Sequence, residues 1–269
     1  LGVILCIPLL LNLLSPAGIS RAAGVGLFTD EGPYWRTNEQ RGEHDNLGSS
    51  ATALIHNKIV NYGLAFTKNY LEHFNGHFLF ISGDDIQRNK VPEFGQMYLL
   101  EIVFLILGFV AVFQNPKNWW PILAWIIIAP IPAALTFQSP HALRAQNLVI
   151  PLTIISAFGA LTLVNWIIKH VPKKFVIYNL AFVILSLLSL WDFSRYLHEY
   201  YVHLGKEFPF SSQYGAKEMV KYVMENESKF NEIYITDRYD QPYILFLFYT
   251  KYDPAKFQQE HVLTERDRF

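Results

Sequence analysis

Apolar positions in this chain gather in long, nearly uninterrupted runs, and polar positions fill the stretches between them. The runs cover residues 1–14, 98–113, 119–137, 147–168 and 175–191. Glu101 is the one charged residue within them. A helix that crosses a bilayer needs about 20 mostly apolar residues, within a range of roughly 17–25. The pattern predicts a mainly α-helical membrane protein, with four transmembrane helices within residues 97–193 and a truncated one at 1–14.

Tryptophans at the ends of the runs support this interpretation. Trp119, Trp120, Trp166 and Trp191 lie at or near run ends, where indole rings favour the membrane interface. The competing interpretation is a set of core helices buried in a soluble protein. A chain of 269 residues is too short to bury four such runs, so we prefer the membrane interpretation.

The first run differs from a secretory signal peptide. Residues 1–14 contain no initiator Met and no basic segment, both of which a signal peptide would have. The run is typical of the end of a spanning helix whose beginning is missing. We therefore expect the chain to be the C-terminal fragment of a longer membrane protein.

Composition excludes several other classes of protein. Charged residues make up 17% of the chain, compared with about 25% in an average soluble domain. The formal net charge of −1 creates no field that would recruit nucleic acid. The single cysteine, Cys6, excludes a disulfide framework. Walker-type loops, G-x-G-x-x-G loops, paired cysteines and the H-E-x-x-H spacing are absent from the sequence.

Positive charges in the short turns between runs set the expected orientation. The turn at 114–118 carries one lysine and the turn at 169–174 carries three, which places both turns on the cytoplasmic side. The turn at 138–146 carries a single arginine and falls on the opposite side. Alternation then places the segments 15–96 and 194–269 outside a plasma or inner membrane.

Residues 15–96 are expected to form an external loop with amphipathic helices. Residues 24–50 are rich in Gly, Thr, Asn and Asp, which indicates mostly loop. Apolar residues recur at three- and four-residue spacing over 51–75, which predicts an amphipathic helix. Such a helix would lie along the membrane surface or pack on the spanning helices.

Residues 194–269 are expected to form a small external α/β domain. The spacing over 214–229 predicts an amphipathic helix, and residues 232–236 are typical of a strand. A second helix, capped by Asp240, would begin near Pro242. The apolar run that follows Pro242 fits a buried strand equally well.

The short external turn contains the most informative candidates for chemistry, His141 and Arg144. They are three residues apart, so on a helical turn they share a face. The guanidinium fork of arginine suits phosphate oxygens, and an arginine at the membrane surface can hold the phosphate of a lipid carrier. The alternative is an arginine that anchors the chain to headgroups non-specifically.

Other ionisable residues lie near the same predicted membrane surface. Asp84, Asp85 and Arg88 could form a polar cluster that binds substrate, or an ordinary surface ion pair. Glu101 lies one turn inside a predicted span, where ionisable groups are costly and often functional; alternatively it stays hydrated at the interface.

A metal site in the external segment is a weaker hypothesis. His73 and His77 are four residues apart, but no third ligand is evident near them. No cofactor is assigned from the sequence, and the use of a divalent metal stays open.

Two segments resemble bacterial membrane glycosyltransferases of the glycosyltransferase family 39 type. The segments are NYLEHFNGHFLFISGDDIQRNKVPEFGQMYLLEIVFLILG and SPHALRAQNLVIPLTIISAFGA. Relatives of that family include protein O-mannosyltransferases and the lipid A aminoarabinose transferase, which share the GT-C fold, a bundle of many spanning helices. The C-terminal segments YGAKEMVKYVMEN, EIYITD and QPYILFLFYTKYDP are also similar to the external domain of many such proteins.

The resemblance implies a donor and a set of roles. Family members take sugar from a polyprenyl-phosphate donor and transfer it to a protein, lipid or glycan acceptor on the periplasmic or extracellular face. His141 and Arg144 match the family's His-Ala-Leu-Arg motif and would lie near the lipid phosphate. The family's catalytic acidic residue comes from the first external loop, upstream of this chain. This fragment alone is therefore expected to be inactive.

Two further function classes compete with the enzyme. A transporter or flippase of a lipid-linked sugar would bind its cargo near the bilayer midplane, and Pro130 and Pro132 within one run fit that class. The predicted spans are otherwise almost free of charge at mid-depth, which favours an interfacial enzyme. A membrane-anchored binding module needs fewer spans than this chain has.

Overall fold

The structure, a computed structural model, describes residues 7–8, 11–12, 15, 19, 23–44, 50–170, 174–237 and 241–261, the first five of the 174–237 stretch by their backbone alone. Regular structure in these residues is helical, and their one β-type pairing is an isolated bridge between Gly26 and Thr136. The mainly α class is therefore confirmed. The predicted truncated span at 1–14 lies mostly outside the described residues. The chain divides into two compact units, Leu1–His203 and Leu204–Phe269.

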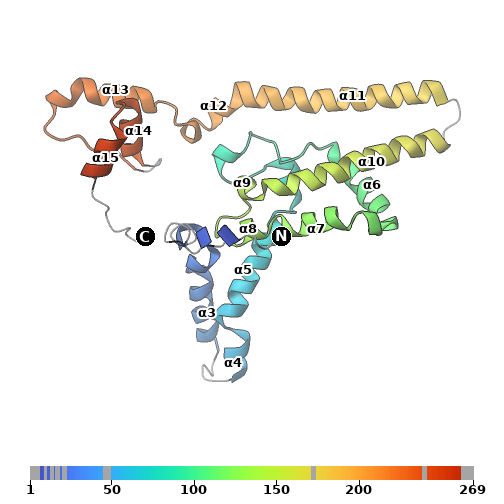
Figure 1. Cartoon of the computed structure of the whole chain (residues 1–269), viewed down its shortest axis with the longest axis horizontal. Coiled ribbons are helices and arrows are strands. Elements are labelled where there is room, and N and C mark those ends of the chain that lie inside the picture. The colour runs from blue at the N-terminus through green and yellow to red at the C-terminus, as the bar shows by residue number, and fades with distance from the viewer. Residues whose placement is uncertain are drawn as a thin grey trace. The chain divides into compact units, whose positions relative to one another are not determined.

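The apolar runs of the first unit form helices, labelled in Figure 1. They are α6 (Glu101–Gln114), α7 (Trp120–Ile128), α8 (Ile131–Ala134), α10 (Val149–His170) and α11 (Lys174–His198). In the described residues, Ala142–His170 and Asn179–Glu207 are long and apolar enough to cross a membrane, which is weak evidence for membrane association. The apolar helices Glu101–Gln114 and Trp120–Ala134 are shorter.

Helices α6 and α10 pack most closely, and two glycines allow this. A Cβ atom added to Gly159 would lie 1.8 Å from the carbonyl oxygen of Phe104, and one added to Gly108 would lie 2.2 Å from that of Ile155. Small residues let the backbones of apolar helices approach each other in this way. The surrounding core includes Val112, Leu152 and Ile155, none more than 3% exposed.

A helical hairpin occupies the segment that was expected to be mostly loop. Helix α3 (Gly32–Gly42) runs beside α5 (Lys58–Glu72), and α4 (Ser50–Ile55) precedes α5. The loop prediction for residues 24–50 was therefore wrong. Pro33 lies in the first turn of α3, a position that suits proline because its missing N–H would have no helical partner there.

Two asparagines shape this hairpin. The Asn57 side chain accepts a hydrogen bond from the backbone N–H of Val60 and so caps α5. This cap splits the single helix predicted over 51–75 into α4 and α5. The buried Asn61 amide donates to the Thr37 hydroxyl at 2.8 Å and to the Gln40 side chain at 2.9 Å, which ties α5 to α3.

The connection from α5 to α6 folds back on itself. A π-helical turn, η2 (His77–Ile81), is paired with the later segment through bonds from Gln96 N to Phe78 O and from Met97 N to Leu79 O. A short 3-10 turn, η3 (Gln87–Asn89), lies between them. Within this reversal Asp84 is fully buried, whereas Asp85 and Arg88 are exposed.

The second unit is helical, which corrects the predicted α/β domain. Its described elements are α12 (Leu204–Glu207), η7 (Phe210–Ser212), α13 (Ala216–Asn226), η8 (Glu227–Lys229), α14 (Pro242–Tyr249) and α15 (Pro254–Glu260). Residues 232–236 form no strand, because no second extended segment of the described chain lies beside them to complete a ladder. The amphipathic helix over 214–229 and the helix at Pro242 are confirmed, whereas Asp240 lies outside the described residues.

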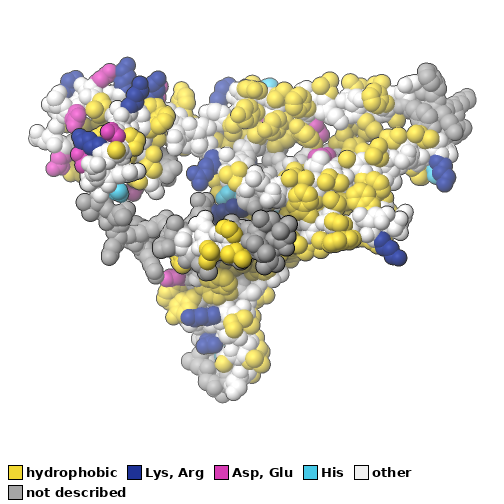
Figure 2. All heavy atoms as spheres, in the orientation of Figure 1, with side chains coloured by type: hydrophobic (Ala, Val, Ile, Leu, Met, Phe, Trp, Pro, Cys, Tyr) yellow, Lys and Arg dark blue, Asp and Glu magenta, His cyan; other side chains and the backbone are white. Residues whose placement is uncertain are grey.

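The surfaces of the helices differ in character. Figure 2 shows hydrophobic side chains covering much of α10 and α11, and charged side chains concentrated on the second unit. On α11 the exposed apolar residues include Phe182, Leu187 and Trp191. An exposed apolar helix of this length fits contact with lipid.

Candidate functional site

A fully buried carboxylate, Asp84, organises the centre of the first unit. It follows Gly83, whose positive φ of 67° makes the turn that directs the chain inward. Its Oδ1 accepts from Ile86 N at 2.8 Å, and its Oδ2 accepts from Asn89 Nδ2 at 2.9 Å and from Ala142 N at 2.7 Å. The last bond connects the loop before α6 to the start of α9 (Ala142–Ala145).

A buried histidine, His73, makes a second connection to the same place. Its Nδ1 lies 2.8 Å from the carbonyl oxygen of Asn69, and its Nε2 accepts a hydrogen bond from His141 N at 3.2 Å. The acceptor role of Nε2 requires the neutral tautomer with the proton on Nδ1. Burial lowers the pKa of His73, in agreement with a neutral ring.

His141 itself is buried and lies at the N-cap of α9. Its Nδ1 has no hydrogen-bond partner and lies 3.7 Å from Asp84 Oδ2. Desolvation lowers the pKa of His141, the charges of Arg144 and Arg88 lower it further, and Asp84 acts in the opposite direction. The lowered pKa favours a neutral ring beside the Asp84 carboxylate.

Arg144 is half-buried, one helical turn into the same segment. Its Nη1 donates to the Thr136 hydroxyl at 2.7 Å, and that hydroxyl donates to Ala133 O at 2.6 Å. The Asn69 amide donates to the Thr136 carbonyl at 2.9 Å, which links α5 to the same loop. We refer to Asn69, His73, Asp84, Thr136 and His141 as the buried hub.

Of the six residues predicted as a site, the structure brings Asp84, His141 and Arg144 together. Asp84 and His141 lie in the buried hub, and the charges of Arg88 and Arg144 act on His141. These two arginines, which both lower the pKa of His141, are called the cationic pair below. The predicted polar cluster of Asp84 with Asp85 and Arg88 does not form, because Asp84 points inward. Asp85 and Arg88 are exposed, and no ion pair between described residues joins them.

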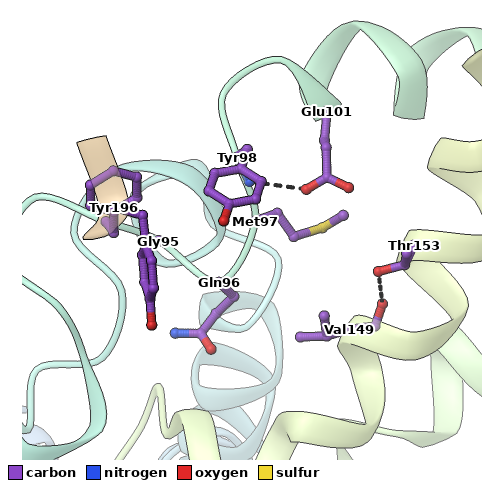
Figure 3. Close-up of a pocket in the computed structure, with 9 residues that line it drawn as sticks. Gly95, Gln96, Met97, Tyr98, Glu101, Val149, Thr153 and Tyr196 are labelled. Carbon is purple, nitrogen blue, oxygen red and sulfur yellow. Dashed lines mark hydrogen bonds between the residues drawn. The ribbon is translucent and has the colours of Figure 1, made fainter. Parts of the chain in front are cut away.

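Glu101 lies apart from the hub, at the first residue of α6. Its Oε2 accepts from Tyr98 N at 3.0 Å and its Oε1 accepts from the Ser156 hydroxyl at 3.3 Å. It lines a pocket of about 330 Å³. In Figure 3 the Glu101 carboxylate extends from α6 toward the space between Tyr98 and Thr153 of α10. Tyr196 of α11 also lines this pocket.

Sequence reasoning missed three members of the hub. Asn69 and Thr136 carry no motif of their own, and His73 was considered only as a metal ligand with His77. Both ring nitrogens of His73 are engaged in hydrogen bonds, which argues against the weaker hypothesis of a metal site shared with the exposed His77. The only available signal was a polar position, Asn69, on the face of α5 that carries Tyr62, Phe66 and Tyr70.

Searches for similar proteins add no identification. The chain matches no protein-family model, no curated protein and no solved structure. Chemically, the arrangement presents the Arg144 guanidinium and a neutral His141 imidazole at the N-terminal end of the apolar helix Ala142–His170. Helix N-termini and arginines both favour negatively charged groups.

Proposed function

We propose that this chain provides the donor-phosphate site of a membrane glycosyltransferase of GT-C type. The donor would be a polyprenyl-phosphate-linked sugar, and the acceptor a protein, lipid or glycan on the periplasmic or extracellular face. The resemblance of the segments around Asp84 and His141 to glycosyltransferase family 39 proteins suggested this class. The site geometry supports it independently.

The observation that carries the proposal is the position of His141 in the buried hub and of Arg144 beside it, at the start of the apolar helix Ala142–His170. Arg88 and Arg144 come from segments far apart in the chain, and the charges of both act on the His141 ring. Asp84 is the opposing charge, and its oxygens are already engaged by three donors.

The location of the cationic pair suits a lipid-linked phosphate. Arg144 lies within Ala142–His170, two residues after the start of a helix long and apolar enough to cross a membrane. A carrier tail can lie along that helix in the bilayer while its phosphate reaches the arginine at the surface. Most of the exposed apolar surface on α10 and α11 would then face lipid (Figure 2).

The chemistry assigned to this chain is stabilisation of the departing phosphate. Transfer of a sugar from a polyprenyl phosphate leaves negative charge on the phosphate oxygens, and fixed cations stabilise that charge. The neutral His141 ring carries one N–H that can donate to a phosphate oxygen. We assign the general base that activates the acceptor to none of the residues of this chain.

The test is a binding measurement on the protein in lipid nanodiscs. A radiolabelled undecaprenyl-phosphate hexose is titrated into wild type, Arg144→Gln and Arg36→Gln. A charge-assisted hydrogen bond contributes about 1.5–3 kcal/mol, so Arg144→Gln should bind about 10–100-fold more weakly. Arg36 is an exposed arginine of α3 paired with Glu39, and its removal is the charge-matched control.

The outcomes separate the proposed enzyme from its alternatives. Unchanged binding by both Arg144→Gln and Arg88→Gln would remove the cationic pair from the donor site. Equal loss in Arg36→Gln would show a general effect of surface charge. Movement of the lipid-linked sugar across the bilayer, without transfer to any acceptor, would favour the transporter or flippase interpretation.

A further inference from the structure

Three side chains of metal-ligating types meet at the end of α11, and none of them belongs to the proposed donor site. Their donor atoms, from His198, Glu199 and His203, all lie within 4.8 Å of one another. His198 Nδ1 is 3.9 Å from Glu199 Oε1, and the two imidazole centroids are 5.0 Å apart. Among the described residues, this is the one place where three such side chains meet.

A π-helical turn produces this meeting. The segment H-E-Y-Y-V-H spaces its histidines five residues apart, and on a regular α-helix residues five apart point about 140° away from each other. Residues Glu199–His203 form the π turn η6, whose bonds join residues five apart. The wider turn brings both rings to one face of the helix.

The five-residue spacing of the histidines can be compared with the spacing in zinc-binding helices. In the H-E-x-x-H arrangement, histidines four apart share one face of an α-helix and bind Zn²⁺ together. The present segment has one residue more, and a π turn accommodates one residue more. The shared face of the two histidines is thereby restored. π turns occur mostly as single turns within α-helices, and frequently at functional sites.

We propose that His198, Glu199 and His203 bind a Zn²⁺-class divalent metal ion. Two imidazoles and one carboxylate are a ligand set found for zinc, and a fourth position is then left for water or an oxygen ligand. Mg²⁺ and Ca²⁺ prefer oxygen ligands throughout, so neither fits this set. Tetrahedral zinc sites place donor atoms about 3.4 Å apart, a contraction that rotation of the exposed His198 side chain can supply.

The position along the helix makes the site accessible from water. The helical stretch Asn179–Glu207 has 29 residues and is about 44 Å long, which exceeds the roughly 30 Å of a hydrocarbon core. Its apolar part ends at Trp191, and polar residues begin at Asp192. His198 lies about 10 Å beyond Trp191 along the axis, outside the apolar layer.

A metal ion bound there would also stiffen one wall of the Glu101 pocket. Tyr200, within the π turn, stacks on Tyr196 with ring centroids 6.2 Å apart, and Tyr196 lines the pocket. Metal ligation across the turn would hold the π geometry and with it the position of the stacked rings. The site therefore connects metal binding to the shape of a cavity in the same unit.

The test is calorimetric titration of ZnCl₂ into the whole chain in nanodiscs, with 1 mM MgCl₂ present throughout. In wild type, one Zn²⁺ per chain should bind in a step tighter than any other. This step should be weakened at least tenfold by each of three substitutions, His198→Asn, His203→Asn and Glu199→Gln. His44→Asn is the matched control, because His44 and His56 also lie ring to ring, at 4.9 Å. It should leave the tight step unchanged.

A spectroscopic readout separates ligation from misfolding. Co²⁺ added in place of Zn²⁺ should give visible absorption typical of tetrahedral nitrogen and oxygen ligation in wild type, and this band should disappear in the His198→Asn/His203→Asn double variant. Circular dichroism should show unchanged helix content in that variant. A tight step that survives the double substitution, or the absence of a tight step in wild type, would overturn the proposal. The donor-binding assay above is independent of both results.

Discussion

Helices α10 and α11 have similar apolar sequences but very different surroundings. About a third of the most apolar stretch of the first is buried within the protein, compared with 6% of the second. The difference follows from residue size. Helix α10 contains Gly159, where the backbone of α6 makes contact, whereas α11 contains no glycine. Apolar character thus makes a helix compatible with lipid, and small residues decide whether another helix packs against it.

The two helices also differ in their polar attachments. The start of the α9–α10 segment is held by bonds from Ala142 N to Asp84 and from His141 N to His73, and both acceptors belong to the buried hub. Helix α11 is attached by Arg195, which lies over the Phe94 ring and bonds to Glu93 O at 3.2 Å near the surface. Buried bonds of the first kind are costly to lose, whereas exposed ones contribute little.

The largest effect is expected where α6 and α10 touch. Gly159→Leu should destabilise the protein by more than about 3 kcal/mol, because any Cβ there meets the Phe104 carbonyl and forces the helices apart. Thermal unfolding in mild detergent measures it. Gly63→Ala is the control: open space surrounds Gly63 in α5, so the change should stabilise by about 0.5–1 kcal/mol. Equal effects of both would refute the close crossing.

The next largest effect is expected from truncation of apolar side chains, which should cost more stability in α10 than in α11. Ile155 of α10 is fully buried, and Ile155→Ala should cost about 2–5 kcal/mol. Leu187 of α11 is 59% exposed, so Leu187→Ala should change stability by less than about 1 kcal/mol. The same detergent unfolding measurement applies. A Leu187→Ala cost as large as that of Ile155→Ala would mean that α11 is packed within the protein.

The attachments can be compared in the same way. Asp84→Asn replaces an acceptor oxygen with an NH₂ group that cannot accept from the surrounding donors, and should cost about 1–3 kcal/mol. Arg195→Ala should cost about 0.5 kcal/mol, since its partners are near the surface. Chemical denaturation of both variants measures the difference. Asp85→Asn, at an exposed neighbour, should leave the stability unchanged. A loss of stability in this variant would indicate that removal of negative charge, and not of buried hydrogen bonds, causes the effect.

The smallest effect is a pH dependence of the hub. Burial lowers the pKa of His73 below its ordinary value of 6.5, so the unfolded chain binds more protons than the folded one below that pH. Stability should therefore fall as the pH decreases below about 6.5, and His141, shifted the same way, adds to the fall. Unfolding curves at pH 7.5 and 5.5 measure this. His73→Gln should flatten the dependence; an unchanged slope would assign it to other groups.

Local patterns predicted most of the helices correctly. The apolar runs became α6, α7 with α8, α10 and α11, and the amphipathic spacing over 214–229 became α13. The errors came where no local pattern decides: α3 in a polar segment, and residues 232–236, which lack a partner strand. A strand's stability depends on a neighbour that can be distant in the chain, whereas a helix makes its backbone bonds within itself.

The candidate site was predicted in its parts but not in its assembly. His141, Arg144, Asp84 and Arg88 were identified by charge and position. That Asp84 is buried, and that it bonds to Ala142 58 residues away, follows from the chain reversal around Gly83 and Gly95. Asn69 and Thr136 could not be identified as hub residues, because the sequence does not show which group a neutral polar side chain bonds to.

The sequence by itself determined where this chain is apolar enough to form helices that suit a membrane, because that property depends only on the residues within each run. The tertiary structure decided which helix is packed and which is exposed, because glycine contacts between α6 and α10 exist only once both are placed. It also decided which charges are buried. A carboxylate such as Asp84 can be buried only where donors from several distant segments replace the hydrogen bonds that water would donate to it.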